Sequence, residues 1–325
     1  MTLIDSSSIR EIRRMRPDEM DEFVTMMQIS FRNSLEEDRL DEDEIRRLMK
    51  KVQSPLYKII TKALGMNMEF YLGTQDGKIA SGIQLGVEKD EVYVGNLMTL
   101  PEYRRQGFAR ELLRISFQIA HEKQIKRVGL GARADNTNAV SLYKSEGFET
   151  TYHTGLFDSD SFNALDTDSS ESLIIREISK ISFEEVGHML DDCFPAAHLE
   201  IKGREKFVKD FVPSRAIRFF ARQLAGQSIN TYAFYANGEE KPKGFIQAAQ
   251  SNVEAKISLS SPILLEKHNE MLIEVIPRIL KIESEIRGLN VASINCSMHR
   301  GDTIAKIEQL GFKKIRESIS MAKFL

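Results

Sequence analysis

Apolar and polar residues follow two different spacings along the chain, and these spacings predict where its strands and helices lie. Short alternating apolar runs predict strands in the first half at residues 9–15, 68–74, 78–87, 91–99, 127–132 and 148–157. Apolar residues three and four positions apart predict helices at 18–27, 45–64, 105–122 and 136–147. Because a helix connects the strands at 91–99 and 127–132, we expect these two strands to be parallel within a mixed sheet.

The second half of the chain follows the same plan. Strands are predicted at 173–178, 216–223, 230–236, 244–251, 256–260, 291–296 and from 313 to 325. Helices are predicted at 182–193, 203–212, 264–287 and 302–310. Gly311-Phe312 stands 164 residues after Gly147-Phe148, which is 311 minus 147. The second half is therefore predicted to repeat the fold of the first.

A polar stretch separates the two halves. Residues 158–172 are poor in apolar side chains and rich in Asp and Ser, which is typical of an exposed linker. A chain of 325 residues also has the length of two ordinary domains. We therefore predict an α/β (α+β) protein with domains at 1–157 and 173–325. Each domain is expected to be a mixed, mostly antiparallel twisted sheet flanked by helices.

Composition narrows the classes of function. The chain is 42% hydrophobic and 29% charged, with a formal net charge of -3, as expected of a soluble globular protein without a global basic field for nucleic acid. No apolar run has the length of a membrane span, and residues 1–20 are too charged for a signal peptide, so we expect a cytoplasmic protein. Two isolated cysteines and six scattered histidines predict neither disulfides nor a bound metal.

One stretch, residues 96–113, carries candidate chemistry. It begins as a strand, turns at Pro101, passes through Arg104 and Arg105, and opens into a helix at Gly107. A helix that begins on a glycine-containing loop presents free N–H groups and the positive end of its dipole, which suits a diphosphate. The alternative is an ordinary strand-turn-helix connection whose arginines are solvated.

A cluster of acidic residues lies between 36 and 44. It could attract a cationic substrate, but such a run is more often a solvated face or the acidic first turn of a helix.

A second stretch, residues 136–148, has to be considered together with the first. Asn136, Ala139, Leu142-Tyr143 and Gly147-Phe148 stand at N-x-x-A-x-x-L-Y-x-x-x-G-F spacing, and the first stretch contains R-x-x-G-x-A from Arg104. Together, over residues 9–157, they resemble the GNAT superfamily of N-acetyltransferases. The resemblance implies two tandem GNAT-like domains, of which the first binds acetyl-CoA as a cosubstrate and acetylates an amine.

The resemblance also implies which residues hold acetyl-CoA. The pantetheine arm pairs with backbone groups of the strand before Pro101, and the pyrophosphate sits on amides at the start of the following helix. The implied cofactor residues are Leu97, Met98, Thr99, Arg104, Arg105, Gln106, Gly107, Phe108, Ala109 and Asn136. Arg110 and Arg133 are further phosphate candidates, and Asn136 is also a candidate N-cap for its helix.

In this family a tyrosine at the position of Tyr143 protonates the departing thiolate, while the substrate amine attacks the thioester directly. Tyr143 is therefore the candidate general acid, and the alternative is a core tyrosine on an amphipathic helix. The ribosomal-protein N-terminal acetyltransferases use a glutamate as base, and the matching position here is Gly131. Glu69, Glu88 and Glu91 remain alternative bases.

The second half lacks most of the residues that carry the resemblance in the first half. With the offset of 164, Tyr143 corresponds to Ile307 and Asn136 to Arg300, and residues 261–268 contain no counterpart of the glycine loop. We expect this half to be degenerate and not to catalyse.

Two classes of function follow. The first is an N-acetyltransferase acting on a primary amine of a small molecule or peptide. The second is a non-catalytic acyl-CoA-binding sensor. No nucleic-acid or membrane partner is expected, and the sequence is compatible with a monomer or a homodimer.

Overall fold

A computed structural model describes residues 9–40, 42–52, 54, 55, 57, 59, 67–162, 172–251, 254 and 256–325. The strands are β1 (Arg10–Arg14), β2 (Asn67–Gln75), β3 (Lys78–Val87), β4 (Val92–Thr99), β5 (Arg127–Arg133), β6 (Glu149–Ser159), β7 (Leu173–Ile178), β8 (Ser228–Ala236), β9 (Gly244–Gln250), β10 (Ile257–Leu259), β11 (Ile263–Leu264), β12 (Ala292–Ser297) and β13 (Lys313–Phe324). The α-helices are α1 (Met20–Glu37), α2 (Glu42–Val52), α4 (Phe108–Glu122), α5 (Thr137–Ser145), α6 (Phe183–Val186), α7 (Leu190–Cys193), α8 (Ala196–Lys202), α9 (Arg204–Phe211), α10 (Arg215–Ala225), α11 (Leu272–Arg287) and α12 (Gly301–Gln309). Short 3-10 turns are η1 (Pro17–Glu19), η2 (Pro101–Tyr103), η3 (Gly187–Met189) and η4 (Glu266–Met271).

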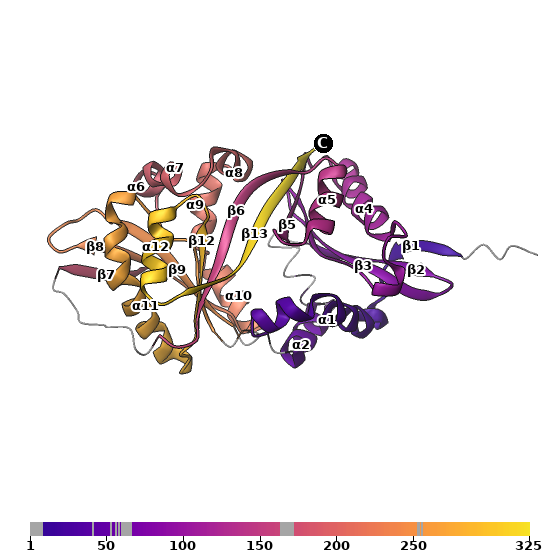
Figure 1. Cartoon of the computed structure of the whole chain (residues 1–325), viewed down its shortest axis with the longest axis horizontal. Helices are drawn as coiled ribbons and strands as arrows, with labels where there is room; N and C mark the ends of the chain where they lie inside the picture. The colour runs from indigo at the N-terminus through magenta and orange to yellow at the C-terminus, as the bar shows by residue number, and fades with distance from the viewer. Residues whose placement is uncertain are drawn as a thin grey trace, which may run out of the picture.

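The strands of both halves form one continuous mixed sheet with helices on its faces (Figure 1). Its order is β1-β2-β3-β4-β5-β13-β6-β12-β10-β9-β8-β7, with β11 paired to β9. Most neighbouring strands are antiparallel, which confirms the predicted fold class. The predicted parallel pair is also confirmed, because β4 and β5 run in the same direction.

The parallel pair diverges along its length. Only Val92 to Val94 pair with Val128 to Leu130, whereas β4 continues to Thr99 and β5 to Arg133. The two strands therefore splay apart towards their carboxyl ends, which is where α4 and α5 begin.

The last strands of the two halves are exchanged. β13 lies between β5 and β6, and β6 lies between β13 and β12, so each half receives a strand from the other. Figure 1 shows these two long strands crossing the middle of the molecule side by side.

The exchanged strands pair at positions that are also related by the offset of 164 residues. Arg133 pairs with Ser318, and adding or subtracting 164 converts this pair into Ser297 and Thr154, which are also partners. Thr154 pairs with its own counterpart Ser318, so a pseudo-two-fold axis passes through that pair. The repeat found in the sequence is thus also a repeat of sheet register.

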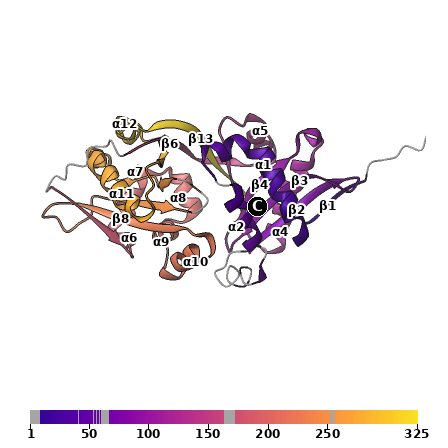
Figure 2. The same cartoon turned by 90° about the horizontal axis from the view of Figure 1, so that it is seen from below.

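The second half differs from the prediction in several elements. Residues 216–223 were predicted as a strand but lie in α10, so that prediction was wrong. Ser214 accepts a hydrogen bond from the Ile217 N–H, and Gly226 ends the helix with a φ of 60°, so caps at both ends outweigh an aromatic-rich sequence. The predicted helix at 182–193 is broken into α6, η3 and α7, and α8 was not predicted. α10 lies on the surface beside α2 (Figure 2).

Parts of two predictions fall outside the described residues. α2 ends at Val52, and most of the predicted continuation to residue 64 is not described. β6 extends into the predicted linker as far as Ser159, and residues 163–171 of that linker are not described. The division at 158–172 therefore stays a prediction.

The acidic run joins α1 to both halves of the sheet. The Asp38 carboxylate lies 2.8 Å from Arg316 on β13 and 3.5 Å from the buried Lys256. Glu37 forms ion pairs with Arg133 on β5 and with Arg316. Since two of its carboxylates are neutralised by basic side chains, this part of the run gives no support to a site for a cationic substrate.

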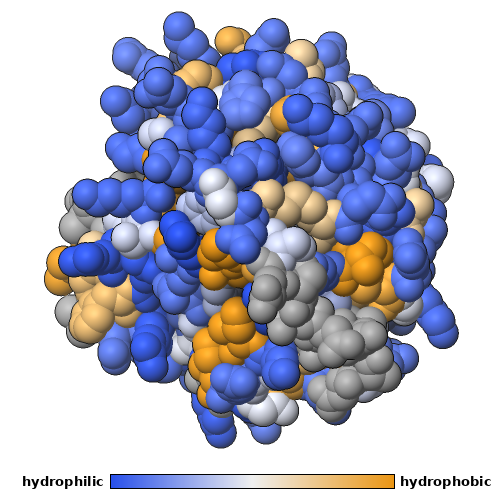
Figure 3. All heavy atoms as spheres, turned by 90° about the vertical axis from the view of Figure 1, so that its left-hand side faces the viewer, coloured by the Kyte–Doolittle hydropathy of each residue, from blue (hydrophilic) through white to orange (hydrophobic). Residues whose placement is uncertain are grey.

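The end of the molecule formed by the second half presents a mostly hydrophilic surface (Figure 3). Apolar side chains on this face occur in small separate patches rather than one broad area. In the described part of the chain, every helix is too short or too polar to cross a bilayer.

Candidate active site

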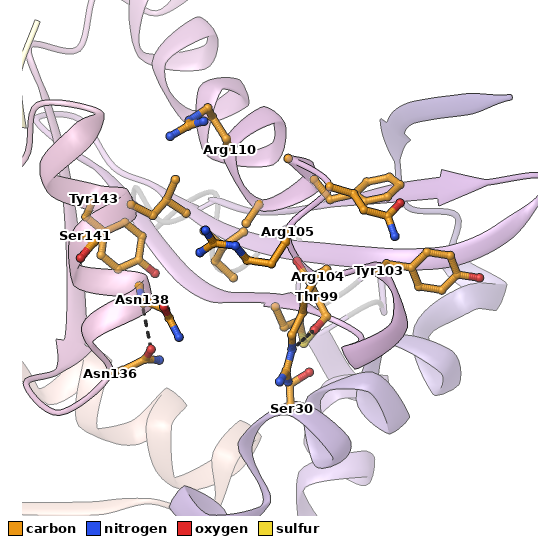
Figure 4. Close-up of a pocket in the computed structure, with 18 of the residues that line it drawn as sticks. Ser30, Thr99, Tyr103, Arg104, Arg105, Arg110, Asn136, Asn138, Ser141 and Tyr143 are labelled. Atoms are coloured by element: carbon orange, nitrogen blue, oxygen red, sulfur yellow. Dashed lines mark hydrogen bonds between the residues drawn. The ribbon is translucent and has the colours of Figure 1, made fainter. Parts of the chain in front are cut away.

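A cavity of about 840 Å³ opens where β4 and β5 diverge, between the start of α4 and the face of α5 (Figure 4). α1 closes a further side of it with Ser30 and Phe31. Phe31 has non-helical backbone angles (φ -120°, ψ 18°), so α1 is kinked where it borders the cavity.

The ten residues that the family resemblance implied for acetyl-CoA all line this cavity. They are Leu97, Met98, Thr99, Arg104, Arg105, Gln106, Gly107, Phe108, Ala109 and Asn136. Tyr143 lines it as well. A space of several hundred Å³ with a mostly apolar wall and a few polar groups is typical of a small-molecule site.

The loop before α4 has the geometry of an anion site. Arg105 has a φ of 63° and Gly107 a φ of 91°, and Gly107 is the N-cap of α4. Left-handed residues within a turn make successive N–H groups converge, and the helix dipole adds positive potential at the same place. The Nε of Arg104 donates to the Thr99 carbonyl at 3.2 Å, which ties the loop to the end of β4.

The two further phosphate candidates differ in position. Arg110 lines the cavity, although its Nε also lies 2.7 Å from Glu146. Arg133 is not among the lining residues, because its guanidinium is held by Asp135 and Glu37. The Asp135 carboxylate, together with Glu37, raises the pKa of Arg133.

Asn136 was predicted both as a cofactor residue and as the N-cap of its helix. Its Oδ1 accepts a hydrogen bond from the Ala139 N–H at 3.2 Å, so it caps α5. Its side chain also lines the cavity.

Tyr143 points from α5 into the cavity (Figure 4). The residue is 7% exposed, and burial raises the pKa of its hydroxyl to about 12. Tyr143 is therefore neutral near pH 7 and able to donate a hydrogen bond.

The candidate bases lie elsewhere. Glu69 accepts hydrogen bonds from Asn67 and Tyr71, Glu88 lies 3.7 Å from Lys206, and Glu91 lies 3.2 Å from Arg127. None of these three carboxylates lines the cavity. At Gly131, where the resemblance would imply a glutamate in one subfamily, an added Cβ would lie 3.1 Å from the Tyr93 hydroxyl, so even a small side chain would be crowded there.

Several lining residues had no signal in the sequence. Ser30 and Phe31 belong to a helix whose path past the cavity depends on tertiary structure, and Tyr103 and Asn138 stand between motif positions. Among the described residues, no group of three or more His, Cys, Asp or Glu side chains is arranged to hold a metal ion.

The corresponding place in the second half is filled by protein. β10 ends at Leu259, and Pro262 interrupts the backbone where β4 continues. Arg300, the N-cap of α12, is 2% exposed and reaches into this region. Its guanidinium donates to the Pro262 carbonyl at 3.4 Å, to Asn269 at 3.3 Å and to the Cys193 sulfur at 3.2 Å.

Comparisons with known proteins agree with this geometry. Residues 30–148 match the family described as the acetyltransferase (GNAT) family. The ribosomal protein bS18-alanine N-acetyltransferase of Escherichia coli (strain K12) is 36% identical over 75 residues, which are 23% of this chain and 51% of that enzyme. The chain thus spans about half the length of the curated relatives it matches.

Two solved structures share the fold of the whole chain. A tandem GNAT protein from the clavulanic acid biosynthesis pathway has a TM-score of 0.62 at 11% identity, covering 97% of this chain and 98% of that one. A GCN5-related N-acetyltransferase from Sphaerobacter thermophilus has a TM-score of 0.59 at 11% identity, covering 97% and 95%. At such low identity these matches show the fold alone, and that fold is a tandem GNAT arrangement.

Proposed function

Because residues 30–148 form a domain of the acetyltransferase (GNAT) family within a tandem GNAT fold, we propose that this protein is an N-acetyltransferase that uses acetyl-CoA. The observation that carries the proposal is the single cavity at the divergence of β4 and β5. It brings a strand end, a helix N-terminus and Tyr143 together.

The two ends of the cavity suit the two ends of the cofactor. The amides from Arg105 to Ala109, at the N-terminus of α4, would receive the pyrophosphate, with Arg104 and Arg110 beside it. The strand end from Leu97 to Thr99, which is not paired with β5, would receive the pantetheine arm through backbone hydrogen bonds. Bound acetyl-CoA would supply an activated thioester, and a strand amide near Met98 would stabilise the oxyanion that forms on its carbonyl.

Tyr143 would act on the departing sulfur. The neutral acceptor amine attacks the thioester carbon, the C–S bond breaks, and the Tyr143 hydroxyl donates its proton to the thiolate. The amine nitrogen loses a proton to water as the amide forms, and a proton from water restores the Tyr143 hydroxyl. With a tyrosine pKa of about 12 and a thiol pKa near 8.5, complete transfer is uphill by about 5 kcal/mol. This cost is smaller than the ~8–23 kcal/mol by which enzymes lower barriers, and hydrogen bonding to the developing charge offsets part of it.

The acceptor is a primary amine of a small molecule or peptide. The curated relatives are named for a ribosomal protein's alanine, but Gly131 stands where the family resemblance would imply a glutamate base for such an acceptor. The acceptor would therefore arrive already deprotonated or lose its proton through water.

The second half would bind no acyl-CoA. Arg300 lies at the place that corresponds to the proposed cofactor site of the first half, where it is buried and donates to the backbone at Pro262. This half would instead complete the sheet by supplying β13.

Release of CoA thiol from acetyl-CoA, measured against a panel of small amines and peptide N-termini, tests the proposed activity. We expect release with at least one amine and much slower release by the Tyr143→Phe variant. Tight acetyl-CoA binding without release in the presence of any acceptor would instead identify an acyl-CoA sensor.

A further inference from the structure

Arg10 lies on β1, and it contacts both the loop before α4 and the first turn of α4. Its Nη1 donates to the Gln106 carbonyl at 2.7 Å. Its guanidinium carbon lies 3.7 Å from the centre of the Phe108 ring, and its Nε lies 3.2 Å from Glu111 on α4. One side chain thus holds the loop, the first residue of α4 and the first turn of that helix.

The Phe108 ring is packed tightly between β2 and the Arg10 side chain. The Phe108 ring packs on Gly73 of β2, where an added Cβ would lie only 2.7 Å from the ring. Arg10 covers the ring as well, and Phe108 is 1% exposed. A guanidinium stacked on an aromatic ring and hydrogen-bonded to a carbonyl has little freedom to move.

The hydrogen bond to Gln106 controls the direction of an amide. In a trans peptide the C=O and the following N–H point to opposite sides. When Arg10 holds the Gln106 carbonyl towards β1, the Gly107 N–H must point away from β1. Gln106 and Gly107 both line the cavity.

The loop needs such a restraint. Arg105 and Gly107, on either side of Gln106, both have positive φ, and a left-handed conformation is uncommon for arginine. The Nη2 of Arg10 is shielded from solvent and lies 3.9 Å from the place that a Cβ on Gly107 would occupy. The positive charge of Arg10 therefore also lies close to Gly107.

We propose that Arg10 is a positioning residue for the diphosphate of acetyl-CoA, which it serves by aiming the Gly107 amide into the cavity. This inference rests on the proposed cofactor. Arg10 does not line the cavity, so it acts through the loop rather than by contact with the ligand.

Binding of two ligands to the full chain tests the proposal. Acetyl-CoA carries the diphosphate, whereas acetyl-pantetheine lacks it but keeps the arm that β4 would bind. For Arg10→Ala, we expect the Kd of acetyl-CoA to rise about 10- to 100-fold, as for loss of a charged hydrogen bond, and the Kd of acetyl-pantetheine to stay unchanged. Arg10→Lys, which keeps one donor and the charge, should recover part of the loss.

The matched control is Arg14→Ala. Arg14 lies on the same strand, pairs with Glu69 and sits over Tyr71, but does not contact the loop. It should leave both dissociation constants unchanged. Equal losses for both ligands in Arg10→Ala, or no loss for either, would overturn the proposal. Failure of the wild-type protein to bind acetyl-CoA would refute the proposed cofactor instead.

Discussion

Burial sets the protonation of two side chains with very different consequences. Tyr143 is kept neutral in the cavity, and His198 is kept neutral in the second half, where its ring centre lies 4.4 Å from that of Tyr152. In both cases loss of water disfavours the charged form. For Tyr143 this protects the proton that the proposed reaction uses, whereas for His198 it makes the fold sensitive to acid.

Replacing Tyr143 with Phe should lower kcat by about 100-fold or more, as for loss of a general acid, and leave the Kd of acetyl-CoA unchanged. Because its pKa is raised to about 12, ionisation of Tyr143 should not reduce wild-type activity below about pH 10. Steady-state kinetics and calorimetry measure the two effects. Unchanged turnover in the variant would remove the acid role.

Acid should destabilise the protein through His198. Burial lowers the pKa of His198 from 6.5 to about 4, so the unfolded chain takes up this proton first as the pH falls. The stability present above pH 6.5 is lost as the pH falls towards 4, by about 3 kcal/mol. The free energy of unfolding, measured with urea at pH 7 and at pH 4.5, should differ less between the two pH values in His198→Phe than in the wild type. His121→Phe, at an exposed position, should behave like the wild type.

At the scale of elements, the loop before α4 depends on a glycine. Gly107→Ala should weaken acetyl-CoA binding about tenfold or more, because alanine is strained at a φ of 91° and the loop must shift its amides to relax. Gly77→Ala is the control, since Gly77 has a φ of 77° in the β2–β3 turn and nothing lies within 4 Å of its added Cβ. It should lose similar stability and bind normally. Equal affinity for both variants, measured by calorimetry, would contradict the role of the loop.

Sequence patterns predicted most elements of the first half because local spacing and turns agreed there with the fold. The ten residues implied for acetyl-CoA followed from the family resemblance of two motifs, and all ten line one cavity, whereas Ser30 and Phe31 of α1 were not predicted. α10 was missed because an aromatic-rich run favours strand by propensity, while its end caps at Ser214 and Gly226 favour helix. Arg10 could not be predicted, since its contact with Gln106 spans 96 residues and arises only when β1 joins the sheet edge.

At the scale of the whole molecule, the halves are interlocked rather than merely joined. β13 covers the edge of β5, and Lys323 on β13 donates to the Glu146 carbonyl at the end of α5 while lying over Phe117 of α4. β13 thus connects α4 and α5, two of the helices that border the cavity. Local sequence patterns predicted this strand but not its partner, because pairing across the halves depends on where each sheet has a free edge.

A fragment of residues 1–157 should therefore be unstable, although it contains every residue of the proposed site. Without β13, the edges of β5 and β6 are unpaired, which favours aggregation. Light scattering and circular dichroism would detect this. Addition of a peptide covering residues 313–325 should restore folding, whereas a scrambled peptide should not. A monomeric, stable fragment that binds acetyl-CoA would contradict the structural role of the exchange.

The central claim is that one half of a repeated fold holds acetyl-CoA and the other has filled its own site with Arg300. Isothermal titration of the full chain with acetyl-CoA tests this claim most directly. The predicted result is one molecule bound per chain, with affinity reduced by Gly107→Ala and unaffected by Gly77→Ala. Two molecules per chain, or binding that is indifferent to the loop before α4, would contradict it.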